Sequence, residues 1–202
     1  FSFIDESLLS NAGDQADLSE QEKEVEKVEK ENFKEVEESL KQAIQEDPEL
    51  KELAQNLIID ETPEGLRIQI VDRDKTSMFK IGQAAPMPHT IKLLKLVSRI
   101  INKLPNRVSI TGHTDSKPYK TRKDYSNWEL SSDRSNAARR YLLKLGLNPE
   151  RIIYVTGKAA TDPLFKDDPH SAQNRRISMI LHRMGHVSKT PVVKKNIEKN
   201  KE

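Results

Sequence analysis

The alternation of strand and helix patterns after residue 57 constrains the fold of this 202-residue chain more than any other feature. Short apolar or alternating runs typical of strands occupy residues 57–59, 66–70, 107–112, 152–156 and 176–181. Helix patterns lie between the second and third runs, and between the third and fourth. The order is strand, strand, helix, strand, helix, strand, strand.

This order predicts an α/β (α+β) domain with one mixed sheet and helices packed on one face. A helix between two strands requires a crossover connection, so the middle strands should be parallel, whereas the ends of the sheet can be antiparallel. The first helix should start at the prolines before residue 90 and end before Pro105. The second should run over about residues 131–145 and end at Gly146.

The start of that second helix is ambiguous. Ser126 with Glu129 forms one possible capping box, and Ser131 with Asp133 offers another start. The later start places Arg134 in the first turn, where a guanidinium opposes the helix dipole and therefore hints at a function.

The segment before residue 57 predicts a linker rather than a core. Ser19 is a plausible N-cap for a helix over residues 19–45. Its thin apolar stripe consists of Val25, Val28, Val36, Leu40 and Ile44, with Phe33 off the stripe. Such a stripe fits either a coiled-coil seam or a solvated helix that docks only at its end. The predicted organisation is a disordered linker (1–18), a linker-helix region (19–56), the folded domain (57–183) and a flexible basic tail (184–202).

Charge and composition narrow the classes of function. Residues 1–60 contain 6 Lys/Arg and 18 Asp/Glu, and residues 61–202 contain 28 and 14, so the halves carry net charges of -12 and +14. The basic half suits an anionic partner, although ordinary surface lysines explain it as well. No apolar run is long enough to span a membrane. The absence of cysteine excludes disulfides, thiolate metal sites and a cysteine nucleophile.

Two charged residues mark a candidate binding site. Asp115 directly follows the strand at residues 107–112, where α/β sheets bind ligands, and can anchor an ammonium group or simply cap a turn. Arg134 can hold a carboxylate through two hydrogen bonds, or form a salt bridge to Asp133 or Asp115. Together, Asp115 and Arg134 suit a zwitterion, such as a free amino-acid end, better than a phosphate.

Three blocks of sequence carry a family resemblance. They are Thr114-Asp115, the run Asn127-x-x-Leu130-Ser131-x-x-Arg134, and Asn174-Arg175-Arg176-Ile177. In this order they resemble the OmpA-like peptidoglycan-binding domain. Further segments, including Met78-Phe79-x-x-Gly82 and Tyr125-Ser126-Asn127-Trp128, are similar to the MotB family of flagellar motor stator subunits. The resemblance covers about residues 35–183.

The resemblance implies a non-catalytic domain that binds the peptide stem of peptidoglycan and anchors the stator to the cell wall, so that torque is transmitted. Asp115 would contact the ammonium of diaminopimelate, and Arg134 its carboxylate. The pocket would be shaped by Thr114, Asn127, Leu130 and Phe79. Arg175 and Arg176 would support it or contact nearby glycan and peptide groups. The implied partners are peptidoglycan, a second copy of the chain, and MotA through a transmembrane segment outside this sequence. The implied location is the periplasmic part of an inner-membrane protein, with no cofactor.

Three alternatives compete with this interpretation. A hydrolase would need His113, Asp115 and Ser131 as a triad, but the sequence lacks a nucleophile elbow, and the histidines have no metal-ligand spacing. A nucleic-acid binder would explain the basic half, but the basic residues are scattered and no recognised motif is present. An OmpA-like anchor of another envelope protein is the nearest alternative.

Overall fold

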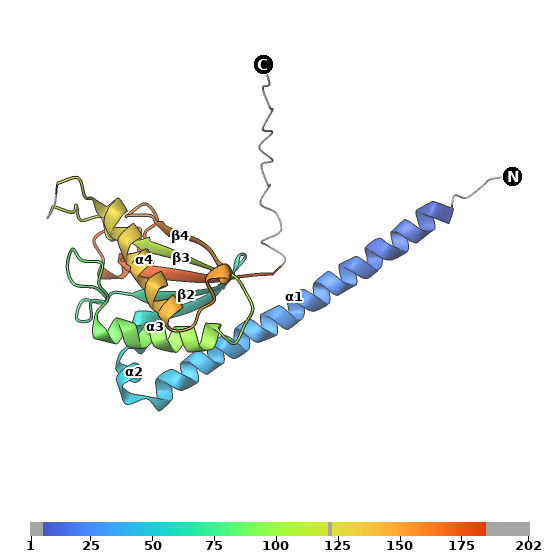
Figure 1. Ribbon diagram of the computed structural model, residues 1–202, viewed down its shortest axis with the longest axis horizontal. Helices are drawn as coiled ribbons and strands as arrows, with labels where there is room; N and C mark the ends of the chain where they lie inside the picture. Colours follow the sequence, from blue (N-terminus) through green and yellow to red (C-terminus); the bar gives the residue numbers. More distant parts are fainter. Residues whose placement is uncertain (1–5, 121–122, 185–202) are drawn as a thin grey trace, which may run out of the picture.

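A five-stranded mixed sheet forms the centre of the molecule (Figure 1). The computed structural model describes residues 6–120 and 123–184, with the side chains of the first helix from residue 23 onward. The strands are β1 (Leu57–Thr62), β2 (Gly65–Val71), β3 (Val108–His113), β4 (Ile152–Gly157) and β5 (Arg176–His182). Their order across the sheet is β1-β2-β5-β3-β4.

The sheet confirms the predicted fold class and corrects one detail of its topology. Strands β1 and β2 form the expected antiparallel hairpin, with Thr62 opposite Gly65. The last strand, β5, is not at an edge: it lies between β2 and β3 and is antiparallel to both. Strands β2, β3 and β4 still run in one direction, but only β3 and β4 are paired in parallel. The connection from β2 to β3 therefore skips one strand position in the sheet, and β5 occupies that position.

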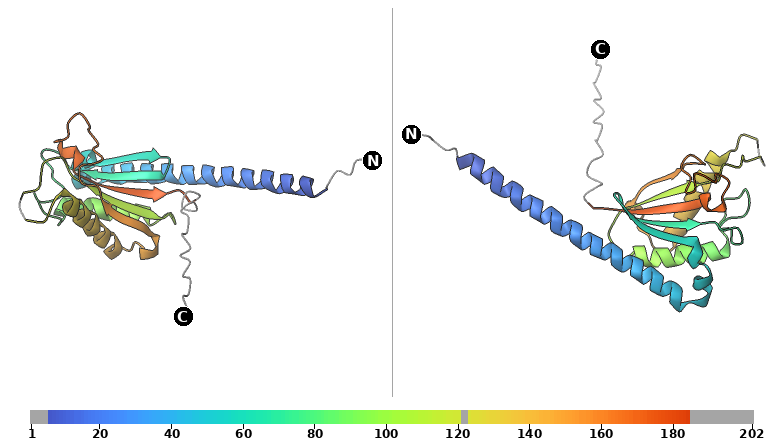
Figure 2. Two further views of the ribbon diagram at one scale, coloured as in Figure 1. Left: turned by 90° about the horizontal axis from the view of Figure 1, so that it is seen from above. Right: turned by 180° about the vertical axis from the view of Figure 1, so that it is seen from behind.

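Helices cover one face of this sheet (Figure 2). The α-helices are α1 (Glu6–Glu46), α2 (Pro48–Glu52), α3 (Pro88–Ile101) and α4 (Asn127–Lys144), and the 3-10 helices are η1 (Ala54–Asn56), η2 (Pro149–Arg151) and η3 (Ala172–Asn174). Helices α3 and α4 bury Leu93, Val97 and Leu142 against alternate strand residues such as Ile68 and Ile110. Period-two alternation sends the intervening strand residues to the opposite face.

Helix α1 differs from the prediction in its start and its buried face. It begins at Glu6 rather than at Ser19, so residues 6–18, expected to be disordered, are helical. This stretch contains three leucines and two alanines, which favour helix, and Gly13 alone does not end it. The ends of the chain, residues 1–5 and 185–202, lie outside the described residues.

The second half of α1 packs on the domain, in agreement with the alternative of a helix that docks at its end. Phe33, expected off the stripe, is only 1% exposed, and it joins Val36, Leu40 and Ile44 in the main core. Val25 and Val28 are 53% and 47% exposed. Beyond the docked part, α1 extends away from the sheet (Figure 1). The core therefore includes residues that precede the predicted domain boundary at residue 57.

Helix α4 uses the earlier of its two possible starts. Ser126 is the N-cap, and its hydroxyl accepts a hydrogen bond from the Trp128 amide. The Glu129 side chain accepts a hydrogen bond from the Ser126 amide, which completes the capping box. The start expected near Ser131 is therefore wrong. Arg134 lies two turns inside the helix, not at its positive end.

Candidate functional site

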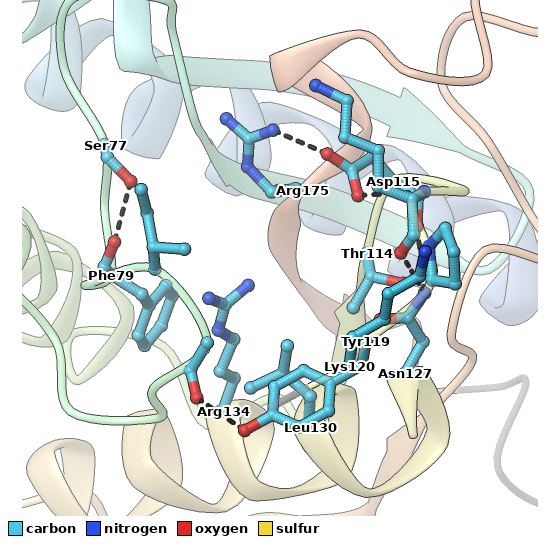
Figure 3. Close-up of a pocket in the computed structure, with 14 residues that line it drawn as sticks. Ser77, Phe79, Thr114, Asp115, Tyr119, Lys120, Asn127, Leu130, Arg134 and Arg175 are labelled. Carbon is cyan, nitrogen blue, oxygen red and sulfur yellow. Dashed lines mark hydrogen bonds and ion pairs between the residues drawn. The ribbon is translucent and has the colours of Figure 1, made fainter. Parts of the chain in front are cut away.

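A pocket of about 490 Å³ opens where β3 ends and α4 begins (Figure 3). One side is formed by the loop over residues 72–87, which precedes α3. The other side is formed by the loop over residues 114–120, which follows β3. The third wall is the first two turns of α4. This position, at the carboxyl end of a strand, is a common location for ligand sites in α/β sheets.

One arginine connects two buried carboxylates at the pocket. Arg175 donates from Nε to Asp72 Oδ2 over 2.7 Å and from Nη1 to Asp115 Oδ2 over 2.6 Å. Burial lowers the pKa of Arg175, but its hydrogen bonds to the two carboxylates outweigh burial and raise the pKa overall. Two carboxylates share one guanidinium, so this group carries a net charge of -1. A ligand cation beside Asp115 would neutralise it.

Arg134 is the opposite case, a buried cation without a carboxylate partner among the described residues. It is 4% exposed, and its Nε donates to the Gln83 carbonyl over 3.0 Å. Its guanidinium lies over the Phe79 ring, 4.8 Å from the centroid. Burial lowers the pKa of Arg134, because burial disfavours the charged form. A ligand carboxylate at this end would supply the missing counter-charge.

The floor of the pocket holds a polar group without a partner. Thr114 is 3% exposed, and among the described residues its hydroxyl has no hydrogen-bond partner. Its amide donates to the Ala159 carbonyl over 2.8 Å, which fixes the backbone beside Asp115. A buried hydroxyl normally finds a partner, so Thr114 is one of the few exceptions among the described residues.

Several contacts hold the loop over residues 114–120 in place. The Asn127 side chain donates to the Lys117 carbonyl over 2.9 Å, from the first turn of α4. The Tyr119 hydroxyl reaches across the pocket and donates to the Gly82 carbonyl over 3.2 Å (Figure 3). The Tyr119 ring also packs on Tyr125, with ring centroids 4.9 Å apart. The two loops are thus tied together across the pocket.

Close packing of α4 on the strand ends positions Leu130 and Arg134. A Cβ on Gly112 would lie 2.0 Å from the Ser131 carbonyl oxygen, so only glycine allows this approach. The Ser131 hydroxyl donates to the Trp128 carbonyl and accepts from the Ala159 amide. The helix start is therefore fixed against both β3 and the loop after β4.

The structure brings together seven of the eight site residues expected from sequence. Those lining the pocket are Phe79, Thr114, Asp115, Asn127, Leu130, Arg134 and Arg175. Arg176 does not line it. Its Nε donates to Gln69 Oε1 over 2.9 Å, and its Nη2 donates to the Asp162 carbonyl, on the sheet face away from the helices. Adjacent residues where a strand begins point to opposite sides, which separates Arg175 from Arg176.

Sequence reasoning missed several residues of the site. Asp72, which is buried, pairs with Arg175 behind the pocket and also accepts hydrogen bonds from the Met78 amide and the Ser77 hydroxyl. Lys117, Tyr119 and Lys120 line the pocket from a loop with no periodic pattern. The only available signal was the concentration of basic and polar residues after Asp115.

The hydrolase alternative finds no geometric support. Ser131 lies on α4, on the helix-covered side of the sheet, and its hydroxyl bonds to backbone groups. His113 pairs with Arg176 across the sheet and belongs to the opposite face. Asp115 is engaged by Arg175. Among the described residues, no group of His, Asp or Glu could hold a metal ion.

Comparison with known proteins identifies the class of this fold and site. A model described as the OmpA family matches residues 78–176, so the chain carries an OmpA-family domain. The chain is 46% identical over 143 residues to "Motility protein B" of Escherichia coli (strain K12), covering 70% of this chain and 46% of that protein. It is 38% identical over 126 residues to "Putative truncated flagellar export/assembly protein LafU" of the same strain, covering 62% and 59%. The chain thus spans about half the length of these relatives.

Solved structures share the fold at low sequence identity. A putative MotB-like protein from Desulfovibrio vulgaris has a TM-score of 0.66 at 22% identity, over 81% of this chain and 96% of that one. The periplasmic domain of Helicobacter pylori MotB has a TM-score of 0.55 at 18% identity, over 63% and 82%. The cell wall anchor of the type VI secretion system (T6SS) from Pseudomonas aeruginosa has a TM-score of 0.56 at 23% identity, over 64% and 90%. None of the helices in the described part of this chain combines the length and apolar character needed to cross a membrane.

Proposed function

We propose that this chain is the cell-wall-binding part of a flagellar stator subunit and that it binds the peptide stem of peptidoglycan without cleaving it. The similarity to Motility protein B supports the stator role, and the OmpA-family match supports wall binding. The T6SS anchor shares the fold, so the fold alone does not separate a stator from another envelope anchor. The 46% identity to Motility protein B favours the stator.

The observation that carries the binding proposal is the pair of opposite, incompletely balanced charges in one pocket. Asp115 and Asp72 share one arginine, and Arg134 has no carboxylate partner among the described residues. The free end of a diaminopimelate side chain carries an ammonium and a carboxylate on the same carbon. Its ammonium would pair with Asp115, and its carboxylate with Arg134. Both charges of the ligand would then be compensated.

Sedimentation with purified diaminopimelate-type sacculi tests this proposal. The parent chain should sediment with the sacculi, and Asp115→Asn and Arg134→Gln should remain in solution. The matched controls are Asp167→Asn and Arg140→Gln, because both residues are exposed and lie outside the pocket lining. Circular dichroism shows whether each variant is folded. Sedimentation of folded pocket variants at the parent level would contradict the proposed site.

The remaining roles concern the whole protein. The stator proposal places the chain in the periplasm, attached to the inner membrane and to MotA through a segment outside this sequence. It also implies a homodimer. Exchange of the matching region of E. coli Motility protein B for residues 35–183 of this chain should restore swimming in a strain that lacks that protein. Wall binding without restored swimming would favour another envelope anchor.

A further inference from the structure

Two lysines at the pocket are left over once the diaminopimelate end has been accommodated. Arg175 is neutralised by Asp72 and Asp115, and Arg134 serves the ligand carboxylate. Lys117 and Lys120 also line the pocket, and neither forms an ion pair with an acidic side chain in the described part of the chain. The bound zwitterion would leave these two positive charges at the pocket without a counter-charge.

We propose that Lys117 and Lys120 bind a second carboxylate of the peptide stem, one that does not belong to the side chain of diaminopimelate. This inference rests on the proposed function and adds a specificity to it. Besides that side chain, an unmodified stem carries the α-carboxylate of its D-glutamate and its C-terminal carboxylate. Amidation of one of these groups would remove a charge that the lysines attract, and would therefore weaken binding.

The backbone that carries the lysines is fixed, although their side chains are exposed. The Lys117 carbonyl accepts a hydrogen bond from Asn127, and the Lys117 amide faces Asp115 Oδ1 over 3.3 Å. Next to Lys120, Tyr119 is bonded to the opposite loop at Gly82. Figure 3 shows Lys120 on the same side of the pocket as Thr114 and Asn127, across from Phe79. The two amines therefore extend from an anchored loop at the pocket margin.

The test uses synthetic stem tetrapeptides that differ in one carboxylate at a time. Calorimetry would measure the affinity of the full chain for four peptides: the free acid, the D-glutamate amide, the C-terminal amide and the double amide. At low ionic strength, amidation of the contacted carboxylate should weaken binding about threefold to fivefold, the range of an exposed charge pair. The single amides distinguish which carboxylate is contacted.

Variants of Lys117 and Lys120 test whether these lysines cause the loss of affinity on amidation. In Lys117→Gln or Lys120→Gln, the ratio of the affinity for the free acid to the affinity for the amides should be smaller than in the parent. Lys123→Gln is the matched control, because it removes the same charge at an exposed residue nearby in the sequence that lies outside the pocket lining. The inference is wrong if the parent binds all four peptides equally. It is also wrong if both pocket-lysine variants keep the parent's ratio of affinities for the free acid and the amides, or if Lys123→Gln reduces that ratio as much as they do. Failure of the parent to bind any peptide would overturn the proposed function as well.

Discussion

Asp72 does not line the pocket, yet several parts of the site depend on it. Its carboxylate accepts hydrogen bonds from the Met78 amide over 2.6 Å and from Arg175 over 2.7 Å. The first fixes the backbone beside Phe79, and the second sets the orientation of the guanidinium that also holds Asp115. One buried side chain thus links the loop before α3 to the acidic end of the pocket.

Asp72→Asn should therefore reduce both stability and binding. The cost should be about 1–3 kcal/mol, because the Asp72 charge is lost from a buried hydrogen-bonded position while Arg175, which is 25% exposed, keeps its ion pair with Asp115. Denaturant unfolding would measure the loss, and sedimentation with sacculi would measure the binding. Asp74→Asn is the control, because Asp74 is an exposed neighbour in the same loop. A parent-like unfolding midpoint for Asp72→Asn would contradict this role.

His113 gives a prediction about pH. Burial, assisted by the charge of Arg176, lowers the pKa of His113 to about 3. In the unfolded chain this histidine takes up a proton near pH 6.5, whereas in the folded protein it stays neutral down to about pH 3. The free energy of unfolding should therefore fall as the pH decreases through this window, with an added slope of up to about 1.4 kcal/mol per pH unit.

Denaturant titrations at several pH values would measure that slope in the parent and in His113→Asn. The variant has no group that titrates at this position, so it should lose the added slope while keeping the contribution of the carboxylates. Equal slopes in the two proteins would show that folding does not lower the pKa of His113.

At the scale of single residues, the sequence identified the site residues that belong to a recognised motif and missed those that do not. Asp115 was identifiable because it directly follows a strand, and Arg134 because the sequence placed it, wrongly, in the first turn of a helix. Asp72 belongs to a loop with no periodic pattern, so only the fold brings it to Arg175. Arg175 and Arg176 were indistinguishable in sequence, because the direction of each side chain depends on how β5 pairs with its neighbours.

At the scale of elements, the contact between α4 and the end of β3 sets the shape of the pocket. The sequence left two starts for α4, because both Ser126 and Ser131 can cap a helix. The structure uses Ser126 and packs Ser131 against Gly112. Sequence alone could not decide between them, because that decision depends on the sheet beneath the helix. With the earlier start, Arg134 lies two turns inside α4 and lines the pocket.

Gly112→Ala should disturb binding without changing any side chain that lines the pocket. The new Cβ would lie 2.0 Å from the Ser131 carbonyl, and overpacking of this kind costs about 1–3 kcal/mol or displaces the helix. We expect a lower melting temperature together with weaker binding of sacculi.

Gly146→Ala provides the matched control at the other end of α4. Gly146 has a positive φ of 93°, so alanine is strained there, but its Cβ would meet only Asn102 Nδ2, at 3.8 Å. This variant should lose about 1 kcal/mol of stability and keep its affinity for the wall. If both variants bind equally well, the close approach at Gly112 does not position the site.

At the scale of the whole molecule, α1 is part of the same core as the sheet. The predicted stripe missed Phe33, because the buried face of a helix depends on the surface that it meets. Here that surface is formed by α3 and the sheet. Glu29, which is buried, adds polar contacts to Asn106 over 2.7 Å and to the Met184 amide over 2.9 Å. The docked half of α1 should therefore unfold together with the domain.

Phe33→Ala tests this joint unfolding. Truncating a fully buried phenylalanine costs about 3–5 kcal/mol, and the loss should appear in the main unfolding transition. Val25→Ala, at an exposed position on the same helix, should change stability by less than about 0.5 kcal/mol. An unchanged main transition for Phe33→Ala would mean that α1 does not contribute to the domain's stability.

The central claim is that one pocket recognises both charges at the end of a diaminopimelate side chain. Its most direct test compares the affinity of the chain for a diaminopimelate stem peptide with that for the lysine analogue, which keeps the ammonium and lacks the carboxylate. A charge-assisted hydrogen bond contributes about 1.5–3 kcal/mol, so the lysine peptide should bind about tenfold or more weakly. That difference should disappear in Arg134→Gln. Equal affinities for the two peptides, or discrimination that survives in the variant, would contradict the account.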